Sequence, residues 1–178
     1  MARSGRGWPV GLMLVALGPV LVAAYAGAGY LAIRTAARAQ VAGPHWEGGM
    51  IDASGLTSLG VDTWRLTWWT ALFTGLLALS YLVIAVLLRR RSRGRTPLLV
   101  VSGILILPYA LGFFFALFNL VGVFANVYES PDFVGGLPWW QPYTAYLLLA
   151  AGLVQAVGLV IADAQGRRAA TDASSATM

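Results

Sequence analysis

The chain has 178 residues, of which 58% are hydrophobic and only 11% are charged. An average soluble domain carries roughly 25% charged residues, so an ordinary water-soluble globular domain is excluded. The absence of cysteine excludes disulfides, thiolate metal sites and thiol redox chemistry. All 12 basic residues are arginines, and the formal net charge is +5.

Four apolar stretches are each long enough to cross a bilayer. A hydrocarbon core of about 30 Å needs roughly 20 apolar residues in a helix. Because backbone groups inside lipid must be paired within their own segment, these stretches are predicted to be helices. We therefore predict an all-α integral membrane protein with four transmembrane helices in a bundle. The predicted helices cover residues 8–33, 66–88, 97–124 and 143–162.

The arginines predict the orientation of this bundle. Basic residues in short loops stay cytoplasmic, and the short segment 89–96 contains five of them. This rule places both termini in the cytoplasm, with nine of the twelve arginines inside. The remaining segments are then an N-terminal tail (1–7), two outer loops (34–65 and 125–142) and a disordered cytoplasmic tail (163–178). The five loop arginines are Arg89, Arg90, Arg91, Arg93 and Arg95.

The basic loop also indicates a partner. Arginines at the bilayer surface attract anionic lipid headgroups, so we expect these five to contact such lipids. The loop is too small for the positioned base contacts that nucleic-acid binding requires, and no nucleic acid is expected. A chain whose basic residues are all arginine and that is rich in Ala, Gly, Val and Leu is typical of a GC-rich bacterial genome. The predicted location is the plasma membrane.

One alternative concerns the first apolar stretch. Arg3 and Arg6 followed by the run Val10–Val22 and small residues resemble a cleavable signal peptide. The apolar run continues to Ile33, whereas the hydrophobic part of a signal peptide usually has about 7–15 residues. Retention as a membrane helix is therefore favoured, and cleavage stays open.

Small and polar residues recur at helical spacing and predict which faces pack together. Helices in lipid associate through close contact of small residues, and these residues fall on one face at 100° per residue. Phe114, Phe115 and Phe118 lie on the opposite side and should meet lipid. The predicted packing residues are Ala23, Ala24, Gly27 and Ala28; Thr67, Thr70, Ala71, Thr74, Ala78 and Tyr81; Ser102, Tyr109, Gly112, Ala116 and Asn119; and Ala145, Leu148, Gly152, Gln155 and Ala156.

The polar members of these faces have two interpretations. They can form hydrogen bonds between packed helices, which is the favoured reading, or they can line a small cavity for a solute. The candidate cavity lining is Thr70, Thr74, Tyr109, Asn119 and Gln155. Pro19 and Pro108 lie inside predicted helices and should kink them.

The chemistry that the sequence lacks shapes the functional prediction. No Asp, Glu, Lys, Arg or His lies inside the four predicted helices, which argues against proton-coupled transport. The only histidine, His45, has Glu47 and Asp52 nearby, but this spacing fits no zinc pattern. We expect no catalytic, metal or cofactor site. The predicted function is a non-enzymatic accessory or scaffold subunit with a membrane-protein partner or as a homo-oligomer. The alternative is a small channel or carrier for a neutral or weakly polar solute.

Overall fold

The computed structural model describes residues 10–90, 95–118 and 120–175, with the backbone alone at 89–90, 95, 120 and 169–174. The helices are α1 (Val10–Ala42), α2 (Ser58–Arg90), α3 (Arg95–Leu117), α4 (Leu120–Val127), α5 (Pro131–Gly135), a 3₁₀ helix η1 (Gln141–Thr144) and α6 (Ala145–Ser175). Among the described residues, extended pairing is limited to one antiparallel bridge between Ile51 and Thr57.

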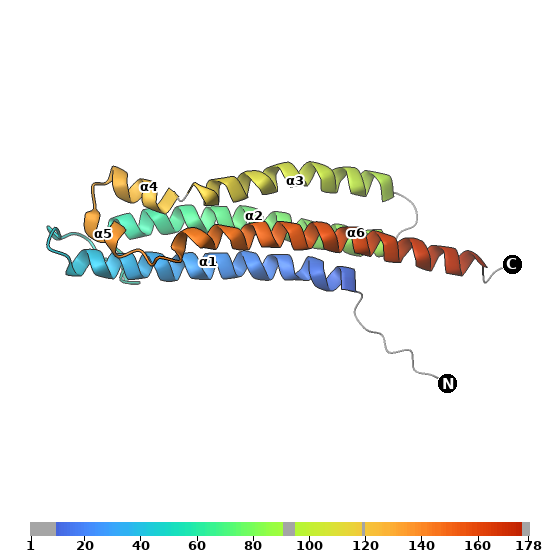
Figure 1. Ribbon diagram of the computed structural model, residues 1–178, viewed down its shortest axis with the longest axis horizontal. Coiled ribbons are helices and arrows are strands. Elements are labelled where there is room, and N and C mark those ends of the chain that lie inside the picture. The colour runs from blue at the N-terminus through green and yellow to red at the C-terminus, as the bar shows by residue number, and fades with distance from the viewer. Residues whose placement is uncertain (1–9, 91–94, 119, 176–178) are drawn as a thin grey trace, which may run out of the picture.

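Four long helices run side by side along the molecule (Figure 1). α1 packs against α6 and α2, while α3 lies on the other side of α2 and α6. All four are long and apolar enough to cross a membrane, which confirms the predicted all-helical architecture. We call the end with residues 43–57, α5 and η1 the cap end, and the opposite end, where α2 finishes and α3 begins, the basic end.

Three of the long helices extend past the predicted spans. α1 continues to Ala42 and α2 begins at Ser58, so most of the expected loop 34–65 is helical. α6 continues to Ser175, although a disordered tail was expected from residue 163. Two features account for this extension: alanine has the highest helix propensity, and Asp163 pairs with Arg167 four residues later.

The third predicted span, 97–124, is divided in the structure. α3 ends at Leu117, and α4 begins at Leu120 as a separate short helix. α4 contacts α5 and α2, so it belongs to the cap end. Asn119, a predicted cavity residue, lies outside the described residues.

The packing face predicted for α1 was wrong. Ala23, Ala24 and Gly27 are exposed, and a Cβ on Gly27 would meet no atom within 4 Å. α1 instead approaches α6 through Gly11 and Gly18. A Cβ on Gly11 would lie 2.6 Å from the Ala162 backbone nitrogen, so the two helix backbones are in direct contact there.

The faces predicted for α2 and α3 are the faces that the structure buries. Thr67, Ala71, Thr74, Ala78 and Tyr81 are buried along α2, with Thr70 half-buried. On α3 the buried residues include Ser102, Tyr109 and Gly112, and a Cβ on Gly112 would collide with Thr74. The three phenylalanines expected to face lipid are exposed, namely Phe114, Phe115 and Phe118.

The cap end has a small core of its own. Phe133 of α5 is fully buried against Ile33, Ala36 and Ala37 of α1. Gln40 connects three segments, because its amide oxygen accepts the Thr57 hydroxyl proton at 2.7 Å and its nitrogen donates to Ser130 Oγ at 2.9 Å. The residues that were expected to form two outer loops therefore make one packed unit.

Candidate functional site

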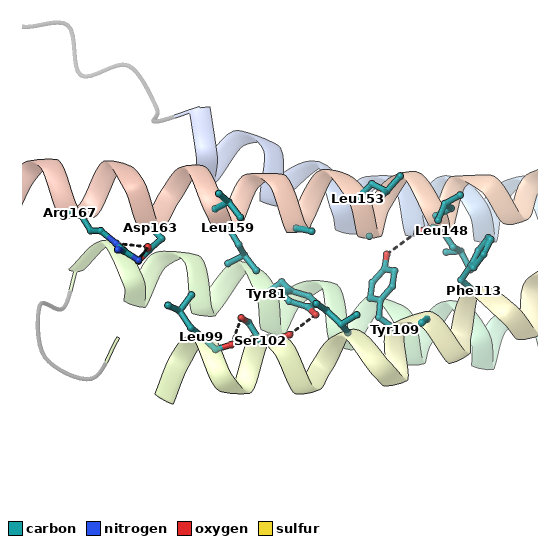
Figure 2. Close-up of a pocket in the computed structure, with 16 residues that line it drawn as sticks. Tyr81, Leu99, Ser102, Tyr109, Phe113, Leu148, Leu153, Leu159, Asp163 and Arg167 are labelled. Atoms are coloured by element: carbon teal, nitrogen blue, oxygen red, sulfur yellow. Dashed lines mark hydrogen bonds and ion pairs between the residues drawn. The ribbon is translucent and has the colours of Figure 1, made fainter. Parts of the chain in front are cut away.

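A groove with a volume of about 570 Å³ lies between α3 and α6 in the described structure. Its lining is almost entirely apolar, and Figure 2 shows it between the two helices. We call it the α3–α6 groove. It is lined by Tyr81, Leu99, Ser102, Ile106, Tyr109, Ala110, Phe113, Leu148, Leu149, Gly152, Leu153, Ala156, Leu159, Val160, Asp163 and Arg167.

Two tyrosines hold the floor of the groove in place. The Tyr81 hydroxyl of α2 donates to the Ser102 carbonyl of α3 at 2.9 Å, and the Tyr109 hydroxyl of α3 faces the Leu148 carbonyl of α6 at 3.4 Å (Figure 2). Their rings meet edge to face, 6.3 Å apart. A Cβ on Gly152 would lie 2.9 Å from the Tyr109 ring, so this glycine lets the ring rest on α6. The tyrosines thus fix α3 at a set distance from α6.

One end of the groove is charged. Asp163 is only 10% exposed, and its Oδ2 accepts from Arg167 Nε at 2.8 Å and Nη2 at 2.6 Å. Two nitrogens of the guanidinium therefore donate to the same carboxylate oxygen. Sequence reasoning assigned both residues to a disordered tail and missed this pair, although the spacing of four residues is the signal for it. The groove consequently has an apolar length and a polar end.

The predicted cavity residues do not surround one common space. Tyr109 lines the α3–α6 groove, whereas Thr74 and Gln155 are fully buried in helix contacts. The Thr70 hydroxyl donates to the Leu66 carbonyl at 3.0 Å and the Thr74 hydroxyl donates to the Thr70 carbonyl at 2.7 Å. Both threonine donors are thus used within α2.

Gln155 of α6 occupies a junction of three helices. Its side-chain nitrogen donates to the Ala78 carbonyl of α2 at 2.9 Å and to the Val15 carbonyl of α1 at 3.3 Å. In a regular helix the Val15 carbonyl would accept from the N–H of residue 19, but Pro19 has none. Gln155 supplies the missing donor, and Gly18 leaves room for its side chain because a Cβ there would overlap it. Its amide oxygen is buried and accepts no hydrogen bond.

A second, much smaller cavity lies nearer the cap end. Its volume is about 30 Å³, which is enough for a water molecule but not for a larger solute. Thr70 is among its lining residues, so one predicted residue does border a polar space. The others that line it are Tyr25, Gly29, Leu66, Thr67, Phe115, Ala116, Val121, Gln141 and Thr144.

The five arginines predicted to contact anionic lipid are described in part. Arg91 and Arg93 lie outside the described residues, and the backbones of Arg89, Arg90 and Arg95 are helical. Arg89 and Arg90 finish α2 while Arg95 begins α3, so all three lie at the basic end. Their contact with lipid stays a prediction.

His45 is not placed with Glu47 and Asp52. It contacts Asp132 of α5 instead, with Nδ1 at 3.2 Å from Oδ1 and its backbone N–H donating to Oδ2 at 3.0 Å. Within the described residues, no three His, Cys, Asp or Glu side chains come together as a metal site would require.

Asp52 stabilises the turn before α2. Its Oδ1 accepts the backbone N–H groups of Ser54 and Leu56, and its Oδ2 accepts the Ser54 hydroxyl proton at 2.6 Å. These bonds, led by the one from the Ser54 hydroxyl, hold the pKa of the Asp52 carboxyl below its usual value.

Comparison of the chain with protein-family models, with curated proteins and with solved structures finds no match. A functional assignment therefore depends on the geometry of the chain itself.

Proposed function

We propose that this chain is a non-enzymatic, multi-pass membrane protein that acts as an accessory or scaffold subunit. It binds a transmembrane helix of a partner protein in the α3–α6 groove. The observation that carries this proposal is an apolar groove of about 570 Å³ on a helix pair that is itself long and apolar enough to cross a membrane.

The residues of the groove support a helix as its occupant. Ala156 of α6 and Ala110 of α3 are small residues that line the groove, whereas Gly152 is covered by the Tyr109 ring. Small residues let helix backbones approach closely, which is the main source of helix association in lipid. The chain already uses this principle between α1 and α6, where a Cβ on Gly158 would lie 2.9 Å from the Gly11 carbonyl oxygen.

The small buried fraction of α3 supports a partner on the α3 side of the bundle. Only 11% of the most apolar stretch of α3 is buried, against 39% for the corresponding stretch of α2. Of the long helices, α3 contacts α2 and α6, which lie on one side of it. A partner helix in the groove would cover apolar surface of α3 that this chain leaves exposed.

The distribution of arginine supports a cytoplasmic basic end. Arg89, Arg90 and Arg95 lie there, and α6 carries Arg167 and Arg168 near the same end. Under the positive-inside rule this end faces the cytoplasm of a bacterial plasma membrane, in contact with anionic lipid.

Transport of a small neutral solute is the alternative function, and it has less support. The hydroxyls of Thr70 and Thr74 are bonded within α2, and Gln155 is enclosed by three helices. The polar cavity beside Thr70 has room for a water molecule rather than for a path.

A matched pair of substitutions tests the scaffold function. Ala156→Phe fills the groove, while Val157→Phe adds the same ring to the neighbouring exposed residue outside it. Both variants and the wild type are purified from native membranes in mild detergent. We expect a stoichiometric membrane-protein partner with wild type and Val157→Phe, and its loss with Ala156→Phe.

The outcome distinguishes the alternatives. Partner recovery that is equal in the two variants contradicts docking in the groove. A second copy of this chain as the retained protein identifies a homo-oligomer. Glycerol flux into liposomes that contain the purified chain should equal flux into empty liposomes. Faster flux that Thr74→Val and Gln155→Leu abolish would favour transport instead.

A further inference from the structure

Within the described residues, two arginines near the cap end have no acidic partner. Arg34 and Arg38 lie one turn apart on α1 and border a surface hollow of about 340 Å³. In the part of the chain that the structure describes, neither guanidinium takes part in an ion pair or hydrogen bond. Val41, Ile51 and Ser54 form part of the same hollow.

Three acidic side chains of the cap end contact groups other than Arg34 and Arg38. Asp52 is close in sequence to Ile51 and Ser54, but both of its oxygens accept bonds within its own turn. Asp132 contacts His45, and Asp62 faces Arg65 at 3.8 Å. The two guanidinium groups therefore present unpaired hydrogen-bond donors at this hollow in the described part of the chain.

The position of the pair matches the phosphate layer of a bilayer. Arg34 follows Ile33 at the end of the first apolar stretch, and Arg38 lies about 6 Å further along the helix. Headgroup layers occupy roughly 5–8 Å on each side of the hydrocarbon core. Both guanidinium groups can thus reach the same layer, with the apolar Val41 and Ile51 beside them.

We propose that Arg34 and Arg38 together bind one phosphate group, as the phosphodiester of a phospholipid or as free phosphate. Planar guanidinium forks match the oxygens of phosphate, and two forks one turn apart can hold a single anion between them. The apolar rim of the hollow favours the lipid source. The depth argument rests on the proposed membrane setting, whereas the binding chemistry does not depend on a partner protein.

A double substitution tests this site on the purified full chain. R34Q/R38Q removes both charges, and Arg65→Gln removes an exposed arginine near the same end of the bundle as the control. Native mass spectrometry after mixing with phosphatidylglycerol micelles counts retained lipid. We expect about tenfold less retention by R34Q/R38Q and wild-type retention by the control.

Inorganic phosphate distinguishes the two sources. If the lipid is the ligand, millimolar phosphate leaves the retention of lipid unchanged. If free phosphate is the ligand, it binds the wild type but not R34Q/R38Q, and it displaces the lipid. Equal binding of both probes by wild type and R34Q/R38Q, with unchanged helix content, would overturn the proposal. Because no partner protein enters this assay, its failure is separate from failure of the scaffold function.

Discussion

Gln155 shows how one polar side chain can repair a backbone defect inside a helix bundle. Pro19 deprives the Val15 carbonyl of its usual donor, and the Gln155 nitrogen from α6 takes that place at 3.3 Å. The same nitrogen donates to the Ala78 carbonyl. An unsatisfied buried carbonyl costs about 1–3 kcal/mol, so this contact stabilises α1 where it lies against α6.

A double-mutant cycle measures this dependence. Gln155→Met keeps the length of the side chain but leaves the Val15 carbonyl without a donor, and we expect a loss of about 1–3 kcal/mol in unfolding free energy. Pro19→Ala restores the N–H of residue 19, so Gln155→Met should cost less in that background. The measurement is reversible unfolding in mixed detergent micelles. Strictly additive effects would contradict the compensation.

Asp52 gives the cap end a defined response to acid. Its folded pKa lies below the ordinary value of 3.8, so the ionised carboxyl stabilises the turn at any pH above about 4. That stabilisation is lost as pH falls through the folded pKa. We expect the amides of Ser54 and Leu56 to lose protection from hydrogen exchange below roughly pH 4. Asp52→Ala removes the acceptor oxygens and should remove the same protection at neutral pH, and protection that persists in acid would refute this role.

The distance between α1 and α6 depends on glycine where the two helices meet. A Cβ on Gly158 would lie 2.7 Å from Val15 Cγ2 and 2.9 Å from the Gly11 carbonyl oxygen. We therefore predict that Gly158→Ala separates the two helices and lowers the unfolding free energy by about 1–3 kcal/mol.

Gly27 on α1 provides the matched control for this prediction. It is exposed, and a Cβ there would meet no atom within 4 Å. Gly27→Ala should change the unfolding free energy by less than about 1 kcal/mol, in the stabilising direction that helix propensity gives. Equal effects of the two substitutions in the same detergent titration would mean that the α1–α6 spacing does not depend on glycine.

The sequence predicted some packing faces and not others for a physical reason. On α2 only one face has Thr67, Thr74 and Tyr81, so polarity and size both identify it. α1 has small residues on more than one face, and composition alone could not separate Gly11 and Gly18 from Ala23 and Gly27.

The candidate site was less predictable than the helices. The width of the α3–α6 groove depends on the contact between the Tyr109 ring and Gly152. That contact is set by the distance between the two helices, which the sequence of neither helix gives. The role of Gln155 likewise requires knowing that Pro19 lies opposite it. Polar residues in the spans could be located by sequence, but the partner of each could not.

At the scale of the whole molecule, the two ends differ in construction. The cap end is packed, with Phe133 buried on α1 and Gln40 bridging Thr57 and Ser130. At the basic end, α2 finishes with Arg89 and Arg90, and α6 carries Arg167 and Arg168 before it ends at Ser175. The charge rule for membrane proteins predicts that the basic end faces the cytoplasm and the packed cap faces outside.

Orientation can be tested with single cysteines, because the natural chain has none and gives no background. Ala53→Cys places a thiol on the exposed turn of the cap end, and Ser175→Cys places one at the exposed end of α6. A membrane-impermeant maleimide added to intact cells should label Ala53→Cys at once and Ser175→Cys only after lysis, because the positive-inside rule predicts a cytoplasmic basic end. The reverse order would invert the topology, and it would move Arg34 and Arg38 to the cytoplasmic leaflet without changing the phosphate chemistry proposed for them.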